Sequence, residues 1–149
     1  MANNFLSPDT HRYATLEGNR DCNRRCSYCN VPNQYSRENE STLDETLQKV
    51  DWLYDNGFRF FSYIGGETLA YEPFVTKEGL TFFDHTREVV RHAHKKGMVV
   101  GVVTNGDFVN ERMIRELSDA GLDSLTFSLH SLTRDQLNER VNLARVTAE

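Results

Sequence analysis

Four short apolar segments alternate with stretches of helical periodicity, and this alternation limits the possible folds more than any other feature of the sequence. Strands are predicted for residues 12–17, 58–64, 98–104 and 125–129. The third segment is apolar nearly throughout, which is typical of a strand buried on both faces. Strands that alternate with helices predict a parallel sheet with helices packed outside it. We therefore expect an α/β fold whose sheet is either open or curved toward a barrel.

The segments between these strands carry the beginnings and ends of helices. The predicted helices span about residues 41–57, 81–96, 110–121 and 133–149. The first and fourth open with the residue pattern of a capping box, and each of the first three ends at or beside a glycine. The sequence thus predicts four consecutive βα units.

Ligands of parallel α/β sheets bind where the strands end and the βα loops emerge. The loops predicted at that edge contain a group of cysteines, Gly65-Gly66-Glu67, Thr104-Asn105-Gly106 and His130-Ser131. The residues with the most distinctive chemistry are therefore expected on one edge of one sheet.

Composition excludes several classes of protein. The chain has 149 residues, which is typical of one domain, with 38% hydrophobic and 26% charged residues. Its net charge of −5 argues against non-specific binding of nucleic acid. No apolar run approaches the roughly 20 residues that span a bilayer, and residues 1–8 lack the features of a signal peptide. A cytoplasmic location is the expectation, with no membrane or nucleic-acid partner.

The three cysteines, Cys22, Cys26 and Cys29, lie within eight residues of one another. An odd number of clustered thiols excludes a disulfide framework and indicates metal or redox chemistry. Thiolates bind zinc or iron–sulfur clusters. A structural zinc site requires four protein ligands, and no histidine lies at zinc-finger spacing from the cysteines. A 4Fe–4S cluster normally takes four cysteines, so three would leave one iron open to a substrate or cofactor.

The spacing CxxxCxxC, with the aromatic Tyr28 before the last cysteine, resembles the signature of the radical S-adenosylmethionine (radical SAM) superfamily. Its position after the first predicted strand agrees with that resemblance. The resemblance implies that Cys22, Cys26 and Cys29 bind three irons of a 4Fe–4S cluster, while S-adenosylmethionine (SAM) chelates the fourth. It further implies reductive cleavage of SAM to methionine and a 5′-deoxyadenosyl radical, which abstracts hydrogen from a substrate. The implied fold is a partial (βα) barrel, of whose usual six units this chain supplies about four.

Three further motifs strengthen the resemblance. Gly65-Gly66-Glu67 matches the family's GGE motif, in which the glycines would let backbone approach the ligand and Glu67 would accept a hydrogen bond from its ammonium group. Thr104-Asn105-Gly106 resembles the TNG turn of the branch that includes the molybdenum-cofactor biosynthesis protein A. Ser128 matches a serine that contacts the SAM carboxylate in that branch. By resemblance, the candidate SAM-binding residues are Gly65, Gly66, Glu67, Thr104, Asn105 and Ser128.

The sequence also departs from the family pattern. Thr68 stands where a proline often follows GGE, and His130 stands where an aspartate often follows the serine. Because two βα units of the family core are missing, we expect residues 1–149 to be a radical SAM core domain truncated at its C-terminus, or one completed by a partner.

Two functions are compatible with these features. The first is a radical SAM enzyme, or the N-terminal part of one, that uses an external flavodoxin- or ferredoxin-like electron donor and a substrate that the sequence does not reveal. The second is a non-catalytic iron–sulfur protein for electron transfer or sensing on the same scaffold. The three-cysteine ligand set and Glu67 favour the enzyme. Two interpretations of Arg24 and Arg25, beside the cysteines, stay open: they raise the cluster's reduction potential or steady anionic thiolates, or they are simply a solvated pair.

Overall fold

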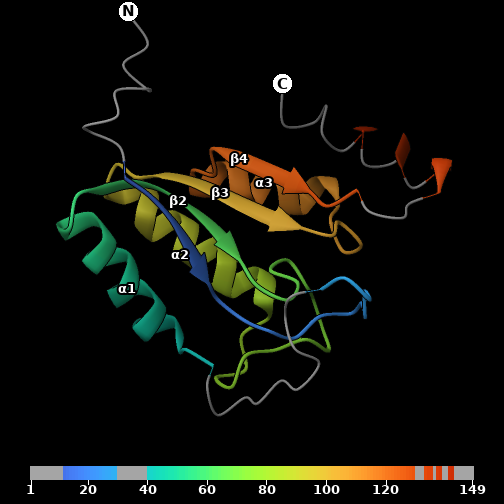
Figure 1. Cartoon of the computed structure of the whole chain (residues 1–149), viewed down its shortest axis with the longest axis horizontal. Helices are drawn as coiled ribbons and strands as arrows, with labels where there is room; N and C mark the ends of the chain where they lie inside the picture. Colours follow the sequence, from blue (N-terminus) through green and yellow to red (C-terminus); the bar gives the residue numbers. More distant parts are fainter. Residues whose placement is uncertain (1–11, 30–39, 130–132, 136, 139–140, 143–149) are drawn as a thin grey trace, which may run out of the picture.

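The computed structural model describes residues 12–29, 40–129, 133–135, 137–138 and 141–142. Within them, four parallel strands form one sheet in the order β1-β2-β3-β4, and in the sequence a helix lies between each strand and the next (Figure 1). The elements are β1 (Arg12–Glu17), α1 (Leu43–Asp55), β2 (Phe58–Ile64), α2 (Phe82–Lys95), β3 (Val99–Thr104), α3 (Glu111–Ala120) and β4 (Ser124–Phe127). The predicted parallel α/β fold is confirmed. The fourth strand lies slightly earlier than predicted and ends before Ser128.

The helices begin at the polar residues that the sequence indicated. The Thr42 side chain accepts the N–H of Glu45, and the Glu45 side chain accepts the N–H of Thr42, so α1 opens with a complete capping box. Thr81 and Asn110 cap α2 and α3 in the same way through one side-chain oxygen each. α3 ends at Gly121, whose φ of 95° is the left-handed conformation that favours glycine. Of the predicted fourth helix, only residues 134–135, 137–138 and 141–142 are described as helical.

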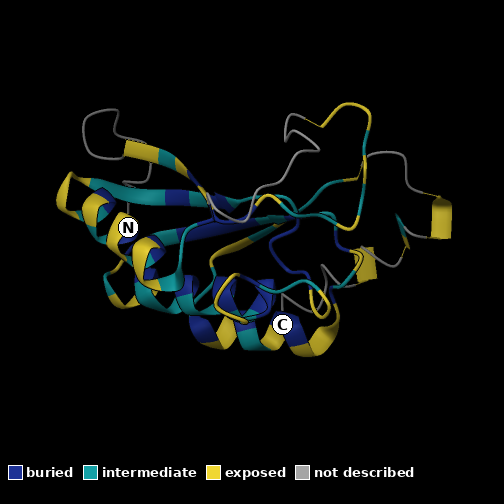
Figure 2. Ribbon diagram, turned by 90° about the horizontal axis from the view of Figure 1, so that it is seen from below, coloured by how far each residue is buried: buried dark blue, intermediate teal, exposed yellow. Residues whose placement is uncertain are grey.

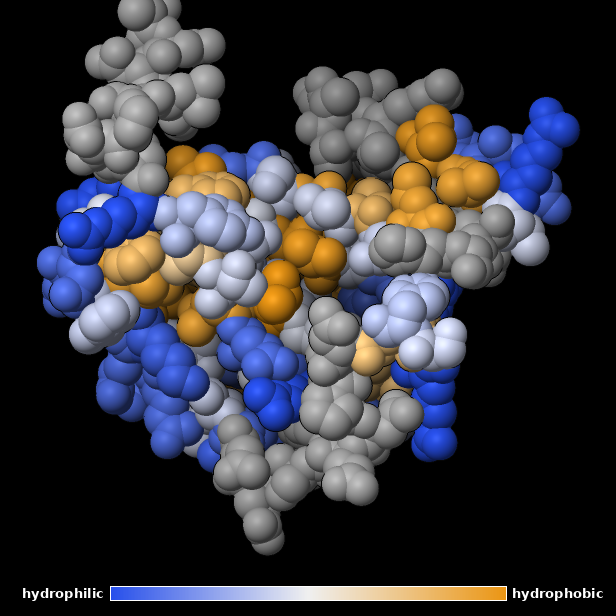
Figure 3. Space-filling view, viewed as in Figure 1, coloured by the Kyte–Doolittle hydropathy of each residue, from blue (hydrophilic) through white to orange (hydrophobic). Residues whose placement is uncertain are grey.

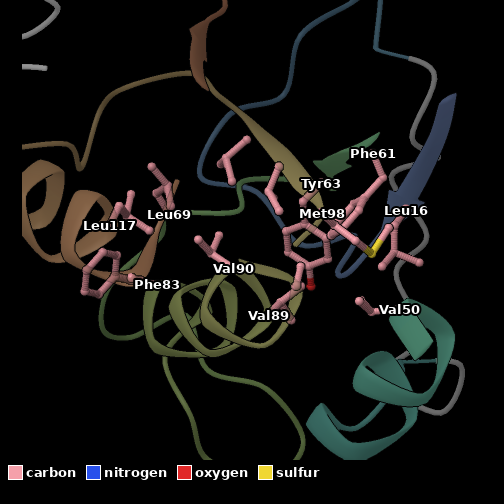
Figure 4. Close-up of a cluster of buried hydrophobic side chains, with 14 of the residues drawn as sticks. Leu16, Val50, Phe61, Tyr63, Leu69, Phe83, Val89, Val90, Met98 and Leu117 are labelled. Atoms are coloured by element: carbon pink, nitrogen blue, oxygen red, sulfur yellow. The ribbon is translucent and has the colours of Figure 1, made fainter. Parts of the chain in front are cut away.

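The hydrophobic core fills the space between the helices and one face of the sheet. Figure 2 shows the helices as a layer on that face, with buried segments in both the strands and the helices. Phe61 and Tyr63 of β2 are fully buried there, together with Val89 and Val90 of α2 (Figure 4). Burying each such side chain stabilises the fold by about 1.5–3 kcal/mol. This one-sided core fixes which residues of each strand point toward the helices.

The opposite face of the sheet is not covered by any of the described helices. Because successive side chains in a strand alternate between faces, Phe60, Ser62 and Ile64 point away from the core that contains Phe61 and Tyr63. Figure 3 shows apolar residues near the centre of the molecule, with hydrophilic residues around them. The sheet therefore has one face packed against helices and one face that the described helices leave open.

Candidate functional site

The C-terminal edge of the sheet contains a cavity of about 230 Å³. Its lining includes all three cysteines and five of the six residues predicted to bind SAM. The lining residues are Cys22, Arg24, Cys26, Tyr28, Cys29, Ile64, Gly65, Gly66, Val103, Thr104, Asn105 and Ser128. Segments separated by up to about a hundred positions in the sequence thus meet around one space, as the parallel topology predicts.

The cysteine loop is held in place by the segment that follows β2. The N–H of Gly18 donates to the carbonyl of Ile64, and the N–H groups of Gly66 and Glu67 donate to the carbonyls of Asn19 and Asp21, each at 2.9 Å. The pairing of β1 with β2 therefore continues past both strands. As a result, the residues immediately before Cys22 are hydrogen-bonded to the GGE segment.

The two glycines of GGE are required by this close approach of the chain to itself. A Cβ atom on Gly65 would lie 2.5 Å from the Asn19 carbonyl oxygen, and one on Gly66 would lie 2.0 Å from that of Asp21. Real Cβ atoms do not approach so closely, so neither position accepts a side chain without a shift of the backbone. From the sequence, we expected the glycines to let the backbone approach a ligand. In the structure, the atoms nearest to these glycine positions belong to the segment that precedes Cys22.

Glu67 is the one predicted site residue that does not line the cavity. It is only 1% exposed, and its Oε1 accepts the Thr104 hydroxyl at 2.5 Å and the N–H of Leu69 at 3.0 Å. Its Oε2 accepts the N–H of Asn105 at 2.7 Å. Burial raises the pKa of this carboxyl, while its hydrogen bonds, that from Thr104 first, oppose the rise. Glu67 thus joins the ends of β2 and β3, and donors of the chain itself occupy the oxygens expected to meet a ligand ammonium.

The residues after β3 connect this buried carboxylate to the cysteine loop. The Thr104 hydroxyl accepts the N–H of Gly106 at 2.9 Å, which shapes the turn. The Asn105 amide donates to Oδ1 of Asn23 at 2.8 Å and lies 3.8 Å from Sγ of Cys22. The N–H of Ser128 donates to the Thr104 carbonyl at 2.8 Å, which brings the residue after β4 to the same place.

The cysteines are free thiols, with Cys22 and Cys26 partly buried and Cys29 exposed. Burial raises the pKa of the Cys22 thiol, and the N–H of Arg24, 3.4 Å from its Sγ, opposes that rise. Three thiols on one loop are the donor set of an iron–sulfur cluster with one open iron. Among the described residues, no three His, Cys, Asp or Glu side chains meet as they would around a single metal ion. What fits such a cluster is the donor chemistry of three free thiols that line one cavity.

Two residues in contact with the predicted site, Asp107 and Asn23, were not singled out by the sequence analysis. Asp107 receives a two-pronged contact from Arg24, with Nε to Oδ2 at 2.6 Å and Nη2 to Oδ1 at 2.5 Å. Asn23 donates to the same carboxylate at 2.8 Å. Residues more than 80 positions apart carry no periodic signal of such contacts, although the position of Asp107 just after the TNG turn placed it at the correct edge. His130 lies outside the described residues.

Comparison with known proteins identifies the family. The sequence model of the Radical SAM superfamily matches residues 16–149. The chain therefore belongs to the radical SAM superfamily, whose members use a 4Fe–4S cluster and SAM. This confirms the family and the cofactors expected from the motifs.

Individual relatives agree with this assignment. The chain is 31% identical over 140 residues to the tungsten-containing aldehyde ferredoxin oxidoreductase cofactor-modifying protein of Pyrococcus furiosus, which covers 93% of this chain and 36% of that protein. It is 30% identical over 129 residues to a GTP 3′,8-cyclase of Helicobacter pylori, with 84% and 36% covered. The chain thus spans little more than a third of the length of these relatives.

Solved structures show the same fold. The crystal structure of BtrN in complex with AdoMet and 2-DOIA superposes with a TM-score of 0.62 at 21% identity, covering 87% of this chain and 50% of that one. SuiB of Streptococcus suis bound to its precursor peptide SuiA gives a TM-score of 0.54 at 10% identity, with 89% and 36% covered. None of the helices within the described residues is long and apolar enough to cross a membrane.

Proposed function

We propose that this chain is the cofactor-binding part of a radical SAM enzyme. One observation carries the proposal: the three cysteines line the same cavity as Gly65, Gly66, Thr104, Asn105 and Ser128. Residues 1–149 then form a four-unit portion of the radical SAM core. The relatives act on different molecules, so the substrate is left open.

In this proposal Cys22, Cys26 and Cys29 hold a 4Fe–4S cluster, and the loops after β2, β3 and β4 position SAM beside it. When bound and reduced, the cluster would supply the electron that cleaves SAM to methionine and a 5′-deoxyadenosyl radical. The backbone of Gly65 and Gly66 forms one wall of the site, and Thr104, Asn105 and Ser128 form another. Ile64 and Val103 add an apolar surface that excludes water. Glu67 does not line the site but stabilises it, because its hydrogen bonds keep the loops after β2 and β3 together.

An external electron donor of the flavodoxin or ferredoxin type would deliver the electron. Tyr28, with 54% of its surface exposed, and the exposed Cys29 both line the cavity. The cluster would therefore be accessible to such a donor from the side of the cysteine loop.

The test is anaerobic reconstitution of the chain with iron and sulfide, followed by EPR spectroscopy of the reduced protein with and without SAM. We expect a 4Fe–4S signal that changes when SAM is added. A variant in which all three cysteines are replaced by alanine should bind no cluster, and it serves as the control. Zinc in place of iron would overturn the cluster assignment, and a cluster signal indifferent to SAM would overturn the assignment of the SAM site. Assay of the same sample for 5′-deoxyadenosine then measures turnover by this chain alone.

A further inference from the structure

Four polar side chains tie the cysteine loop to the loop after β3. We call this group of Asn23, Arg24, Asn105 and Asp107 the loop bracket. Asn23 is its centre, because it donates to Asp107 at 2.8 Å and accepts from Asn105 at 2.8 Å. The N–H of Asp107 donates to Oδ1 of Asn105 at 2.9 Å, which closes the network. These hydrogen bonds, together with the contact of Asn105 with Cys22, join the two loops.

The charged pair of the bracket is oriented with its cation toward the site. Arg24 lines the cavity together with all three cysteines, whereas Asp107 is not among the lining residues. The side chains are 23% and 26% exposed, so water screens the pair only in part. The hydrogen bond to Asp107 is the main cause that raises the pKa of Arg24, and the charges of Cys26 and Cys22 add smaller contributions in the same direction. Arg24 therefore lines the same cavity as the thiols, while its guanidinium is held by a carboxylate that does not line it.

We propose that the loop bracket sets the reduction potential of the cluster, with Arg24 raising it and Asp107 offsetting that effect while it holds Arg24 in place. This inference rests on the proposed function. Reduction adds negative charge to a cluster, so a fixed cation beside the ligating thiolates favours the reduced state and a nearby carboxylate disfavours it. Arg24 and Asp107 act through the thiolates and are positioning residues, because neither ligates the cluster.

The proposal predicts effects of opposite sign from the two halves of the pair. Arg24→Gln removes the cation and leaves Asp107 unbalanced, so the potential should fall. Asp107→Asn leaves the cation without its carboxylate, so the potential should rise. The double variant removes both charges and should lie between the two single variants, near the unmodified chain. A bracket with only a mechanical role would loosen in the same way in both single variants, with shifts of one sign or none.

The experiment is a redox titration of the reconstituted chain, followed by EPR in the absence of SAM. Arg91→Gln is the matched control, since it removes the same charge from an ion pair with Glu88 in the C-terminal half of α2, away from the strand edge that carries the cysteines. It should leave the potential unchanged. Arg24→Lys keeps the positive charge but cannot make the bidentate contact with Asp107. The reduction potential of the cluster in this variant should therefore stay close to that in the unmodified chain.

The outcomes separate this inference from the function on which it rests. Opposite shifts in the two single variants support it. A cluster whose potential is the same in Arg24→Gln, Asp107→Asn and the unmodified chain overturns the inference and leaves the proposed function intact. Should Arg24→Gln fail to assemble a cluster, the comparison of Arg24→Lys with Asp107→Asn decides instead: a rise in Asp107→Asn alone supports the proposal, and equal potentials refute it. An unmodified chain that binds no iron overturns both.

Discussion

Two regions of this small sheet, the face packed against the helices and the C-terminal edge, are stabilised by different interactions. Toward the helices, fully buried side chains such as Phe61, Val90 and Leu117 pack without specific polar contacts. At the C-terminal edge, the loops are joined by hydrogen bonds of defined geometry, through Glu67 and through the loop bracket. Packing tolerates exchange among apolar residues of similar volume, whereas each hydrogen bond needs its own partner. The core therefore sustains the fold, and the edge sets the positions of the groups that would meet a cofactor.

The largest effect on stability is expected in the core. Leu117 of α3 has no exposed surface, so Leu117→Ala should leave a cavity and lower the free energy of unfolding by about 2–5 kcal/mol. Urea denaturation followed by circular dichroism measures this change. Folded Leu117→Ala should still bind iron like the unmodified chain, because the cysteine loop does not contact α3 through any hydrogen bond of the described residues. Loss of iron at low urea would contradict the separation of core and edge.

A single methyl group at the edge should disturb both stability and cluster binding. In Gly66→Ala the new Cβ would lie 2.0 Å from the Asp21 carbonyl oxygen, which moves the segment leading to Cys22. We expect a loss of about 3 kcal/mol in unfolding free energy and a several-fold drop in bound iron after reconstitution. Gly57→Ala is the control, since a Cβ there meets no atom within 4 Å although its φ is 84°. It should lose stability without losing iron.

Replacing the buried carboxylate should have a smaller effect with a distinctive pH dependence. Glu67→Gln cannot accept hydrogen bonds at both side-chain oxygens, so we expect a loss of about 2 kcal/mol in unfolding free energy. Because burial raises the pKa of Glu67 above its unfolded value, its titration contributes stability that is fully present below the unfolded pKa, near 4.5, and lost as the pH rises through the folded pKa. Urea titrations between pH 4 and 8 should show this decline in the unmodified chain and a flatter profile in Glu67→Gln. Identical profiles would contradict the assignment.

The smallest expected effect comes from a histidine in the core. His85 is a buried residue of α2 whose Nδ1 is 3.0 Å from the hydroxyl of Tyr63 in β2, and burial lowers its pKa below 6.5. The unfolded chain therefore binds a proton more readily, and stability should fall as the pH decreases below about 6.5. His85→Leu should remove this part of the slope, whereas the exposed His94→Gln should retain it. Denaturation at several values between pH 5 and 8 tests the difference, and an unchanged slope in His85→Leu would refute it.

Much of the fold was predictable because its signals are local. Strand and helix periodicity, the capping residues Thr42 and Asn110, and the glycine at 121 each depend on residues within a few positions of one another. The placement of the cysteines beside Thr104 and Ser128 also followed from the sequence, since parallel strands bring their C-terminal ends to one edge. The end of β4 was predicted less well, because short strands are bounded by pairing with a neighbour and not by their own residues.

The sequence by itself determined the order of the βα units, the residues near which the first three helices begin and end, and the family to which the chain belongs. Only the tertiary structure decided the partners at the strand edge. It showed that Glu67 is buried and bonded to the loop after β3, that Gly65 and Gly66 are packed against the carbonyls of Asn19 and Asp21, and that Arg24 is paired with Asp107. The physical reason is range: hydrophobic periodicity records whether a residue is buried, whereas the direction of a hydrogen bond depends on which distant segment the fold brings within 3 Å.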